Sequence, residues 1–259
     1  MVDARQAAYL QALGVDVYVP RSAPPWQDEE VGETTAPAVP AALTPSPVVT
    51  TRADETTPHP DIAANLGWDE LRAAVAACQR CDLHATRTQT VFGVGSREAR
   101  WMFIGEAPGA EEDRQGEPFV GRAGQLLTSM IRALGLRRED VFIANVLKCR
   151  PPDNRDPKPS EAASCRRYLE RQVALVNPTL VIAVGRIAAQ NLLATETPIA
   201  KLRGKVHSFG AQAWPVVVTY HPAYLLRSPG EKRKSWQDLL HARQLFGRLE
   251  QESASGGRA

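Results

Sequence analysis

Residues 101–134 read WMFIGEAPGAEEDRQGEPFVGRAGQLLTSMIRAL and contain the pattern that decides the fold. The first four residues form a short apolar run, which is typical of a buried β-strand. Apolar residues recur at helical spacing from Leu126 to Leu134, which predicts a helix. A long loop rich in glycine separates the two elements. In an open α/β sheet, ligands bind where strands end and helices begin, so this loop is the first candidate for a functional site.

The order of strand, loop and helix recurs along the chain. Strands are predicted at residues 101–105, 141–147, 179–184 and 215–219. Helices are predicted at residues 68–77, 121–135, 186–194 and 234–250, with another around Cys165. Residues 82–100 and the region around Gly204 and Gly210 are predicted to be irregular. Alternating strands and helices indicate a parallel sheet covered on both faces. The sequence therefore predicts a three-layer α/β/α fold with a four-stranded central parallel sheet.

Composition divides the 259 residues into a folded domain and extensions. Residues 1–19 read as a short amphipathic helix and a strand-like piece that would dock on the main domain or on a protein partner. Residues 20–62 contain nine of the 20 prolines, and such a segment buries too little apolar surface to fold. We therefore expect a disordered linker at 20–62, a folded domain at 63–250 and a flexible tail at 251–259.

Charge is distributed unevenly along the chain. Residues 1–63 contain three basic and nine acidic residues, whereas the rest contains 28 basic and 20 acidic residues. A basic domain behind an acidic segment suggests a polyanionic partner, although no dense lysine or arginine patch is present. No apolar run approaches the roughly 20 residues that span a bilayer, and no signal pattern begins the chain. We expect a cytoplasmic protein without a membrane partner.

The four cysteines, Cys78, Cys81, Cys149 and Cys165, all lie in the predicted folded domain. A close C-x2-C pair followed by two single cysteines is a pattern for four thiolate ligands. The spacing alone leaves zinc and a [4Fe–4S] cluster open. The cluster is favoured because zinc sites usually carry two close pairs. Four unrelated buried cysteines are the remaining alternative. Any metal group here is expected to be structural.

Four side chains that suit ligand binding lie at the carboxyl ends of the predicted strands: Glu106, Phe119, Asn145 and His221. A buried amide needs a hydrogen-bond partner, and an amide both donates and accepts, so Asn145 is suited to reading the edge of a nucleobase. The carboxyl ends of parallel strands meet at one edge of the sheet, so we expect these side chains to converge.

These motifs resemble the uracil-DNA glycosylase superfamily, and in particular its iron–sulfur family 4. The matching segments are 105–109 with 111–113, 116–124, 145–152 with 154–155, and 221–227. The resemblance covers about residues 68–250 and implies the fold of that superfamily. It also implies base-excision repair, in which uracil is flipped out of single- or double-stranded DNA and its N-glycosidic bond is hydrolysed.

The resemblance also implies roles for single residues. Phe119 would stack on the flipped uracil, and Asn145 would pair with uracil N3–H and O4. His221 would donate to O2, where negative charge develops. Gly105 and Ala107 would line the pocket and place a water molecule, and Glu112 would exclude the 5-methyl group of thymine.

The group that activates the water is less directly implied. Ala107 stands where a well-known branch of the superfamily has an aspartate, so the adjacent Glu106 is the candidate catalytic carboxylate. An alternative function therefore stays open, namely a uracil-DNA reader or repair adaptor that binds without cleaving.

The resemblance extends to DNA contacts and to the cofactor. The segment with Leu225 and Leu226 would wedge into the base stack. Arg227, Arg155 and Lys148 would contact phosphates. The four cysteines match the ligands of a [4Fe–4S] cluster, with zinc less favoured. We expect a monomer.

Overall fold

The computed structural model of the chain describes residues 63–256. The predictions for residues 1–62, namely a helix and strand, a linker and a contact with a protein partner, lie outside the described residues.

The centre of the described domain is a sheet with four parallel strands in the order β3-β2-β4-β6. These strands are β2 (Trp101–Gly105), β3 (Phe142–Asn145), β4 (Leu180–Val184) and β6 (Trp214–Thr219). Nearly every residue in them is buried, because helices cover both faces of the sheet. The four predicted parallel strands are confirmed.

Two short antiparallel strands extend the sheet at its edges and make it six-stranded. β1 (Val94–Gly95) pairs with β3, and β5 (Val206–Phe209) pairs with β6. Both segments had been predicted to be irregular. β1 is only two residues long, and Gly95 has a φ of +120° and lies so close to the Val141 carbonyl that a Cβ would sit 1.8 Å from its oxygen. Apolar periodicity cannot reveal a strand of this kind.

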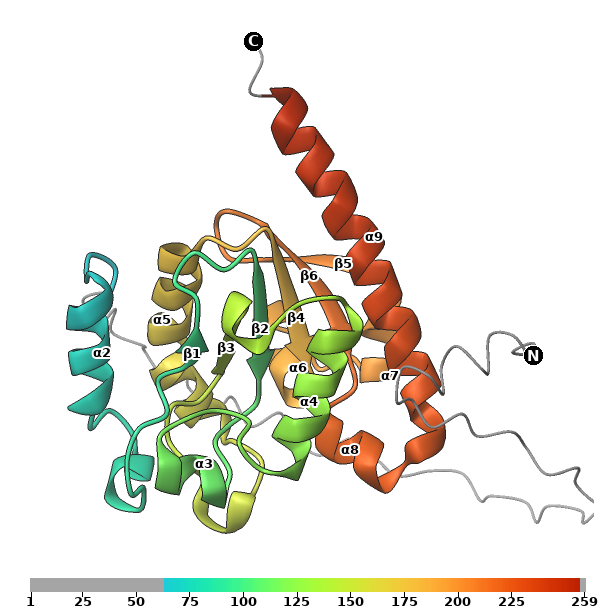
Figure 1. Ribbon diagram of the computed structural model, residues 1–259. Coiled ribbons are helices and arrows are strands. Elements are labelled where there is room, and N and C mark those ends of the chain that lie inside the picture. The colour runs from blue at the N-terminus through green and yellow to red at the C-terminus, as the bar shows by residue number, and fades with distance from the viewer. Residues whose placement is uncertain (1–62, 257–259) are drawn as a thin grey trace, which may run out of the picture. The chain divides into compact units, whose positions relative to one another are not determined.

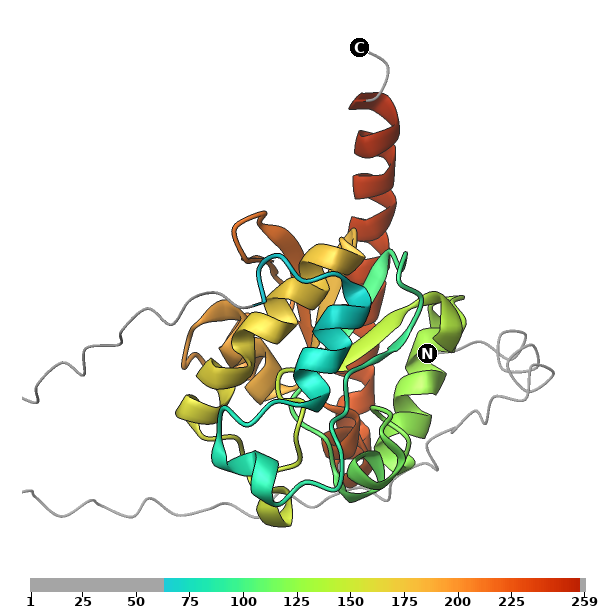
Figure 2. The same cartoon turned by 90° about the vertical axis from the view of Figure 1, so that its left-hand side faces the viewer.

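Helices form a layer on each face of the sheet (Figure 1). One face is covered by α2 (Trp68–Ala76), α5 (Pro159–Val176), α6 (Arg186–Leu193) and α7 (Ile199–Leu202). The other face is covered by α4 (Arg122–Ala133), α8 (Pro222–Arg227) and α9 (Lys232–Gly256). The view in Figure 2 shows α2 and α5 side by side in front of the strands. Each layer has its own apolar core, so the predicted α/β/α architecture is confirmed.

Four helices differ from the prediction, among them α7, for which no helix was expected. The glycine-rich loop contains α3 (Ala110–Gln115), and the segment after β6 forms α8 and not a loop. α9 begins before residue 234 and continues to Gly256, so residues 251–256 are helical and do not form the expected tail. The remaining short elements are the 3₁₀ turns η1 (Asp82–Ala85), η2 (Arg138–Asp140), η3 (Pro152–Asn154) and η4 (Pro229–Glu231). No helix within residues 63–256 has the combined length and apolarity of a membrane span.

Candidate functional site

A cleft of about 820 Å³ lies at the carboxyl ends of the parallel strands. Its lining includes eight residues predicted from the sequence: Glu106, Ala107, Glu112, Phe119, Asn145, Arg155, His221 and Arg227. They are brought together because β2, β3 and β6 end at the same edge of the sheet. In the register of the sheet, Gly105 at the end of β2 lies directly opposite Asn145 at the end of β3. The predicted convergence is confirmed.

Asn145 is buried at the bottom of this cleft with an amide oxygen, Oδ1, that accepts no hydrogen bond within the described residues. An unsatisfied buried acceptor costs roughly 1–3 kcal/mol, so proteins rarely keep one without a use. Gly105 makes room for it, because a Cβ on Gly105 would lie 2.5 Å from Asn145 Oδ1. The arrangement leaves an acceptor ready for a donor on a ligand.

Phe119 forms the neighbouring wall of the cleft. Its backbone has a φ of +56°, a conformation that bulky residues rarely adopt and that costs about 1–3 kcal/mol. Its ring centroid lies 5.6 Å from that of His221. A Cβ on Gly105 would lie 2.5 Å from Phe119 Cζ, so the same glycine admits both the amide and the ring.

Glu112 lies on α3 and uses its carboxylate on the backbone of the loop. Glu112 Oε1 accepts hydrogen bonds from the N–H groups of Val120 at 3.0 Å and Gly121 at 3.3 Å. These bonds fix the residues that follow Phe119. The predicted exclusion of a thymine methyl group by Glu112 stays a prediction.

His221 is held as a neutral imidazole with a defined tautomer. It is the N-cap of α8, and its Nδ1 accepts the N–H of Ala223 at 3.2 Å. The proton of the neutral ring is therefore on Nε2. Burial, with the charge of Arg227 as a second cause, lowers the pKa of His221 to about 4. Gly185 packs against the ring, since a Cβ there would lie 2.9 Å from His221 Cβ.

Glu106 is a carboxylic acid with an unusual affinity for its proton. Burial, followed by the nearby charge of Asp156, raises its pKa to about 7, and Arg186 opposes this shift. Asp156 and Arg186 form an ion pair of 2.6 Å, and both line the cleft. A carboxyl group that titrates near neutral pH in a cleft is suited to proton transfer.

Asp156, Arg186 and Gly185 are not among the residues predicted from the sequence. Gly185 and Arg186 follow β4 directly. The rule that polar residues after a strand face the cleft identifies Arg186 once it is applied to all four strands, not to three.

Near the rim of the cleft, the residues predicted to contact DNA differ in exposure. Leu225 is only 1% exposed and packs in the core, whereas Leu226 is 36% exposed. Leu225 therefore cannot act as the wedge in this conformation, because the turn of α8 points it toward α4 and β6. Arg227 is exposed and lines the cleft.

Lys148 is 1% exposed, and its Nζ donates to the Asn145 carbonyl at 2.8 Å. Its prediction as a phosphate contact is wrong, since the side chain turns inward from the loop after β3. Arg155 lines the cleft but makes a bidentate pair with Glu161, with distances of 2.9 and 2.6 Å.

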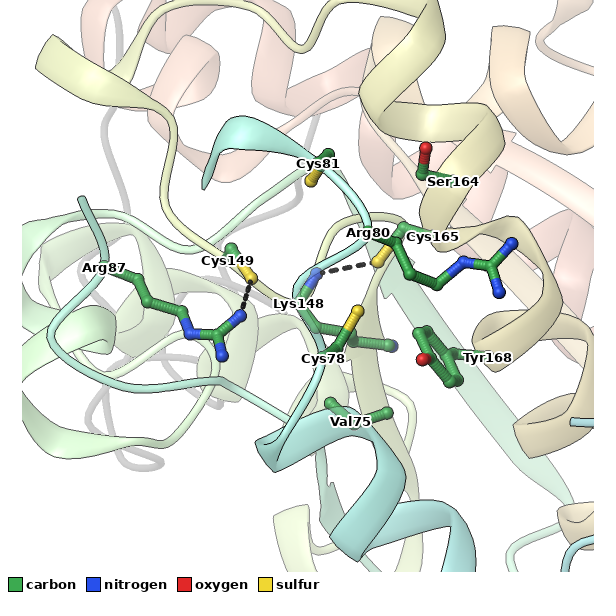
Figure 3. A pocket seen from close by; sticks show the side chains of 10 residues that line it. All are labelled: Val75, Cys78, Arg80, Cys81, Arg87, Lys148, Cys149, Ser164, Cys165 and Tyr168. Atoms are coloured by element: carbon green, nitrogen blue, oxygen red, sulfur yellow. Dashed lines mark hydrogen bonds between the residues drawn. The ribbon is translucent and has the colours of Figure 1, made fainter. Parts of the chain in front are cut away.

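The four cysteines lie around a second pocket, away from the cleft (Figure 3). Cys78 and Cys81 follow α2, Cys149 is in the loop after β3, and Cys165 is on α5. All four are free thiols. Residues separated by up to 87 positions in the sequence thus meet at one place, as the spacing predicted.

Two of the sulfur atoms accept N–H hydrogen bonds, which favour a thiolate, whereas burial favours the neutral thiol. Arg87 Nη1 donates to Cys149 Sγ at 3.1 Å, and the backbone N–H of Lys148 donates to Cys165 Sγ at 3.4 Å. Burial raises the pKa of Cys165 to about 12, while the charge of Lys148 opposes this shift. No three Cys, His, Asp or Glu side chains of residues 63–256 are arranged to hold a single metal ion.

The fold and the cleft define a doubly wound α/β protein with its largest described cleft at the carboxyl ends of its parallel strands, where such folds bind ligands. Residues 92–240 match the model of the uracil DNA glycosylase superfamily, and the chain belongs to this superfamily.

Several curated proteins are similar over most of their length. The chain is 45% identical over 188 residues to the type-4 uracil-DNA glycosylase of Archaeoglobus fulgidus, an alignment that covers 70% of this chain and 94% of that relative. Identity to the type-4 uracil-DNA glycosylase of Thermotoga maritima is 46% over 60% of this chain and 80% of that relative. A type-5 uracil-DNA glycosylase of Thermus thermophilus is 36% identical over 40% of this chain and 54% of that relative.

Proposed function

We propose that this chain removes uracil from DNA by hydrolysing the N-glycosidic bond, as the first step of base-excision repair. The observation that carries the proposal is the unsatisfied Asn145 Oδ1 beside the Phe119 ring and the neutral His221. The names of the type-4 relatives support the same activity. A base inside a duplex cannot reach such a cleft, so the nucleotide must be flipped out of the stack.

Asn145 would select the base. Its Oδ1 accepts from uracil N3–H while its Nδ2 donates to O4. Cytosine presents an acceptor at N3 and a donor at C4, so the same amide would face it with mismatched groups. The Phe119 ring would stack on the selected base.

His221 would stabilise the leaving group. Negative charge develops on the uracil ring as the bond to the sugar breaks, and part of it resides on O2. A neutral imidazole that donates from Nε2 can hold this charge without an earlier proton transfer. A donor that is fixed in place before the reaction is the efficient way to stabilise a transition state.

The ionised carboxylate of Glu106 would orient the attacking water. Ala107 offers no carboxylate, and Glu106 is the ionisable neighbour that lines the same cleft. Its raised pKa makes it basic enough to take a proton from water near neutral pH.

The rim of the cleft would contact the DNA. Leu226 is the exposed apolar residue of α8 and would fill the space that the flipped base leaves. Arg227 beside it would bind a phosphate. We propose that uracil is removed from both single- and double-stranded DNA.

The four cysteines would hold a [4Fe–4S] cluster. The four thiols come from three separate segments, and N–H groups donate to the sulfur atoms of Cys149 and Cys165. Such a set of ligands suits a cluster. The cluster would supply a structural link between α2, the loop after β3, and α5. Zinc is the less favoured alternative. The monomeric state and the cytoplasmic location stay predictions.

The test is a cleavage assay on a uracil-containing oligonucleotide with protein purified without oxygen, in which alkali reveals abasic sites. We expect cleavage by the full chain and a loss of about 100-fold or more in Asn145→Ala and in His221→Ala. His207→Ala is the matched control, because His207 lies on the edge strand β5 and not in the cleft. Iron content should be unchanged in all three variants.

A reader that binds without cleaving is the second candidate, and Ala107 is the residue that favours it. This function predicts tight binding of uracil-containing DNA over the matching thymine-containing DNA, with no abasic sites formed. That outcome would contradict the proposed hydrolysis.

A further inference from the structure

We propose that Arg138 is a positioning residue that holds Phe119 in the conformation needed for stacking on the flipped base. The inference rests on the proposed function. Arg138 begins η2, the turn before β3, and is 19 positions from Phe119 in the sequence. No motif in the sequence links the two residues.

The guanidinium of Arg138 is committed to the loop that carries Phe119. Its Nη2 donates to the Pro118 carbonyl at 2.7 Å and to the Phe119 carbonyl at 3.2 Å, and its Nη1 donates to Thr128 Oγ1 at 3.2 Å. All three acceptors are neutral oxygen atoms. Burial lowers the pKa of Arg138, with the charge of Glu117 acting in the opposite direction. A partly desolvated charge makes stronger hydrogen bonds than one in water, so these contacts hold the turn firmly.

Glu112 holds the same turn from its other side. Its carboxylate accepts the N–H groups of Val120 and Gly121, whereas Arg138 binds the carbonyls of Pro118 and Phe119. The peptide groups before and after Phe119 are therefore fixed by side chains of opposite charge.

Such a clamp is what the backbone of Phe119 requires. A bulky residue with a φ of +56° persists only where its surroundings impose this conformation. The Phe119 carbonyl also packs against Gly124, where a Cβ would lie 1.7 Å from its oxygen. Without Arg138, the carbonyl is free to rotate, and the ring would leave its place beside Gly105 and His221.

Arg137 provides a matched control. It is the preceding residue and is exposed, with 72% of its side chain accessible. Its guanidinium bonds to Asp140 at 2.8 and 2.5 Å and not to the loop. Arg137→Gln therefore removes the same charge from the same turn without releasing Phe119.

The experiment compares Arg138→Gln, Arg138→Lys and Arg137→Gln, each alone and combined with Phe119→Ala. Three quantities are measured: kcat/KM on a single-stranded uracil oligonucleotide, inhibition by free uracil, and affinity for an oligonucleotide with an abasic site. The abasic product lacks the base on which Phe119 stacks, so its affinity reports the state of the rest of the DNA site.

For Arg138→Gln we expect kcat/KM to fall about tenfold and the inhibition constant of free uracil to rise by a similar factor, the order expected for the partial loss of one stacked base. Affinity for the abasic oligonucleotide should not change. Arg138→Lys should recover part of the lost kcat/KM. In the Phe119→Ala background, neither Arg138 substitution should lower kcat/KM below that of Phe119→Ala alone.

Equal behaviour of Arg138→Gln and Arg137→Gln would overturn the inference. The inference would also be overturned if Arg138→Gln lowered kcat/KM by the same factor with and without Phe119→Ala. It would be overturned as well if Arg138→Gln weakened binding of the abasic oligonucleotide by the same factor as it lowers kcat/KM. If Arg138→Gln does not fold, Arg138→Lys alone decides by the same comparisons. A wild-type chain that cleaves no uracil DNA contradicts the proposed function itself, which is a different outcome.

Discussion

At the scale of single residues, Gly105 decides how closely Asn145 and Phe119, the groups proposed to read the base, approach each other. Asn145 Oδ1 and Phe119 Cζ would each lie 2.5 Å from a Cβ on this glycine, well inside van der Waals contact. A side chain here must push both groups away from the place where a base would sit. The proposed reading of the base would thus depend on a glycine, whose lack of a side chain leaves room for both groups.

Gly105→Ala is therefore expected to lower kcat/KM on uracil DNA by about 100-fold, since it displaces the amide and the ring together. Gly247→Ala is the control, because nothing lies within 4 Å of a Cβ at that position. Steady-state kinetics and a thermal melt of both variants check the prediction. Wild-type activity in Gly105→Ala would show that the amide and the ring do not need their present positions.

The proposed role of Glu106 predicts that the activity depends on pH. Its pKa of about 7 means that it is protonated below neutral pH and ionised above. Only the ionised form accepts a proton from water, so kcat/KM should rise as pH increases through about 7. His221, with a pKa of about 4, is neutral across this range and adds no second step there.

The pH profile of Glu106→Gln provides the check. We expect this variant to lose about 100-fold in kcat/KM at pH 8 and to show no rise between pH 6 and 8. A full rise that persists in Glu106→Gln would assign the ionisation to another group.

At the scale of elements, α8 separates two adjacent leucines into different roles. Leu225 faces the core, and Leu226 faces outward beside the cleft. Leu225→Ala should lower the free energy of unfolding by about 2–5 kcal/mol, because it leaves a cavity. Leu226→Ala should leave stability within about 0.5 kcal/mol.

The activity of the same two variants tests the wedge. Leu226→Ala should reduce cleavage of double-stranded substrate more than cleavage of single-stranded substrate, because only a duplex must be opened. Denaturant unfolding and paired assays on the two substrates measure both effects. Equal losses on both substrates would contradict a wedge at Leu226.

The sequence predicts elements well where burial imposes a pattern. The four parallel strands are continuous apolar runs, and the long helices α4 and α5 carry clear stripes, so both kinds of element could be found. β1 and α3 are too short for periodicity, and they form because the surrounding fold provides partners.

The same limit applies to the candidate site. Asn145 and His221 could be predicted because polar residues after apolar strands must face the cleft. Arg138 could not, because its partners lie in another segment and ordinary surface arginines look the same in a sequence.

At the scale of the whole molecule, the cysteine site lies where three parts of the domain meet. Cys78 and Cys81 follow α2, and Cys165 is on α5. Cys149 is in the loop that begins after Asn145, at the end of β3. A metal group bound there would link the periphery of the fold to the floor of the cleft. Loss of that group should therefore lower the stability of the domain and disturb the cleft at the same time.

Cys165→Ser tests this link. Removing one ligand of a structural metal group costs several kcal/mol, so we expect bound iron to fall and the thermal midpoint to drop by about 10 °C or more. Ser164→Ala is the control, because Ser164 lines the same pocket and bonds only to the Ser160 carbonyl, at 2.8 Å. Metal analysis distinguishes iron from zinc in the wild-type chain. Unchanged metal content and an unchanged midpoint in Cys165→Ser would mean that the four cysteines meet without holding a metal group.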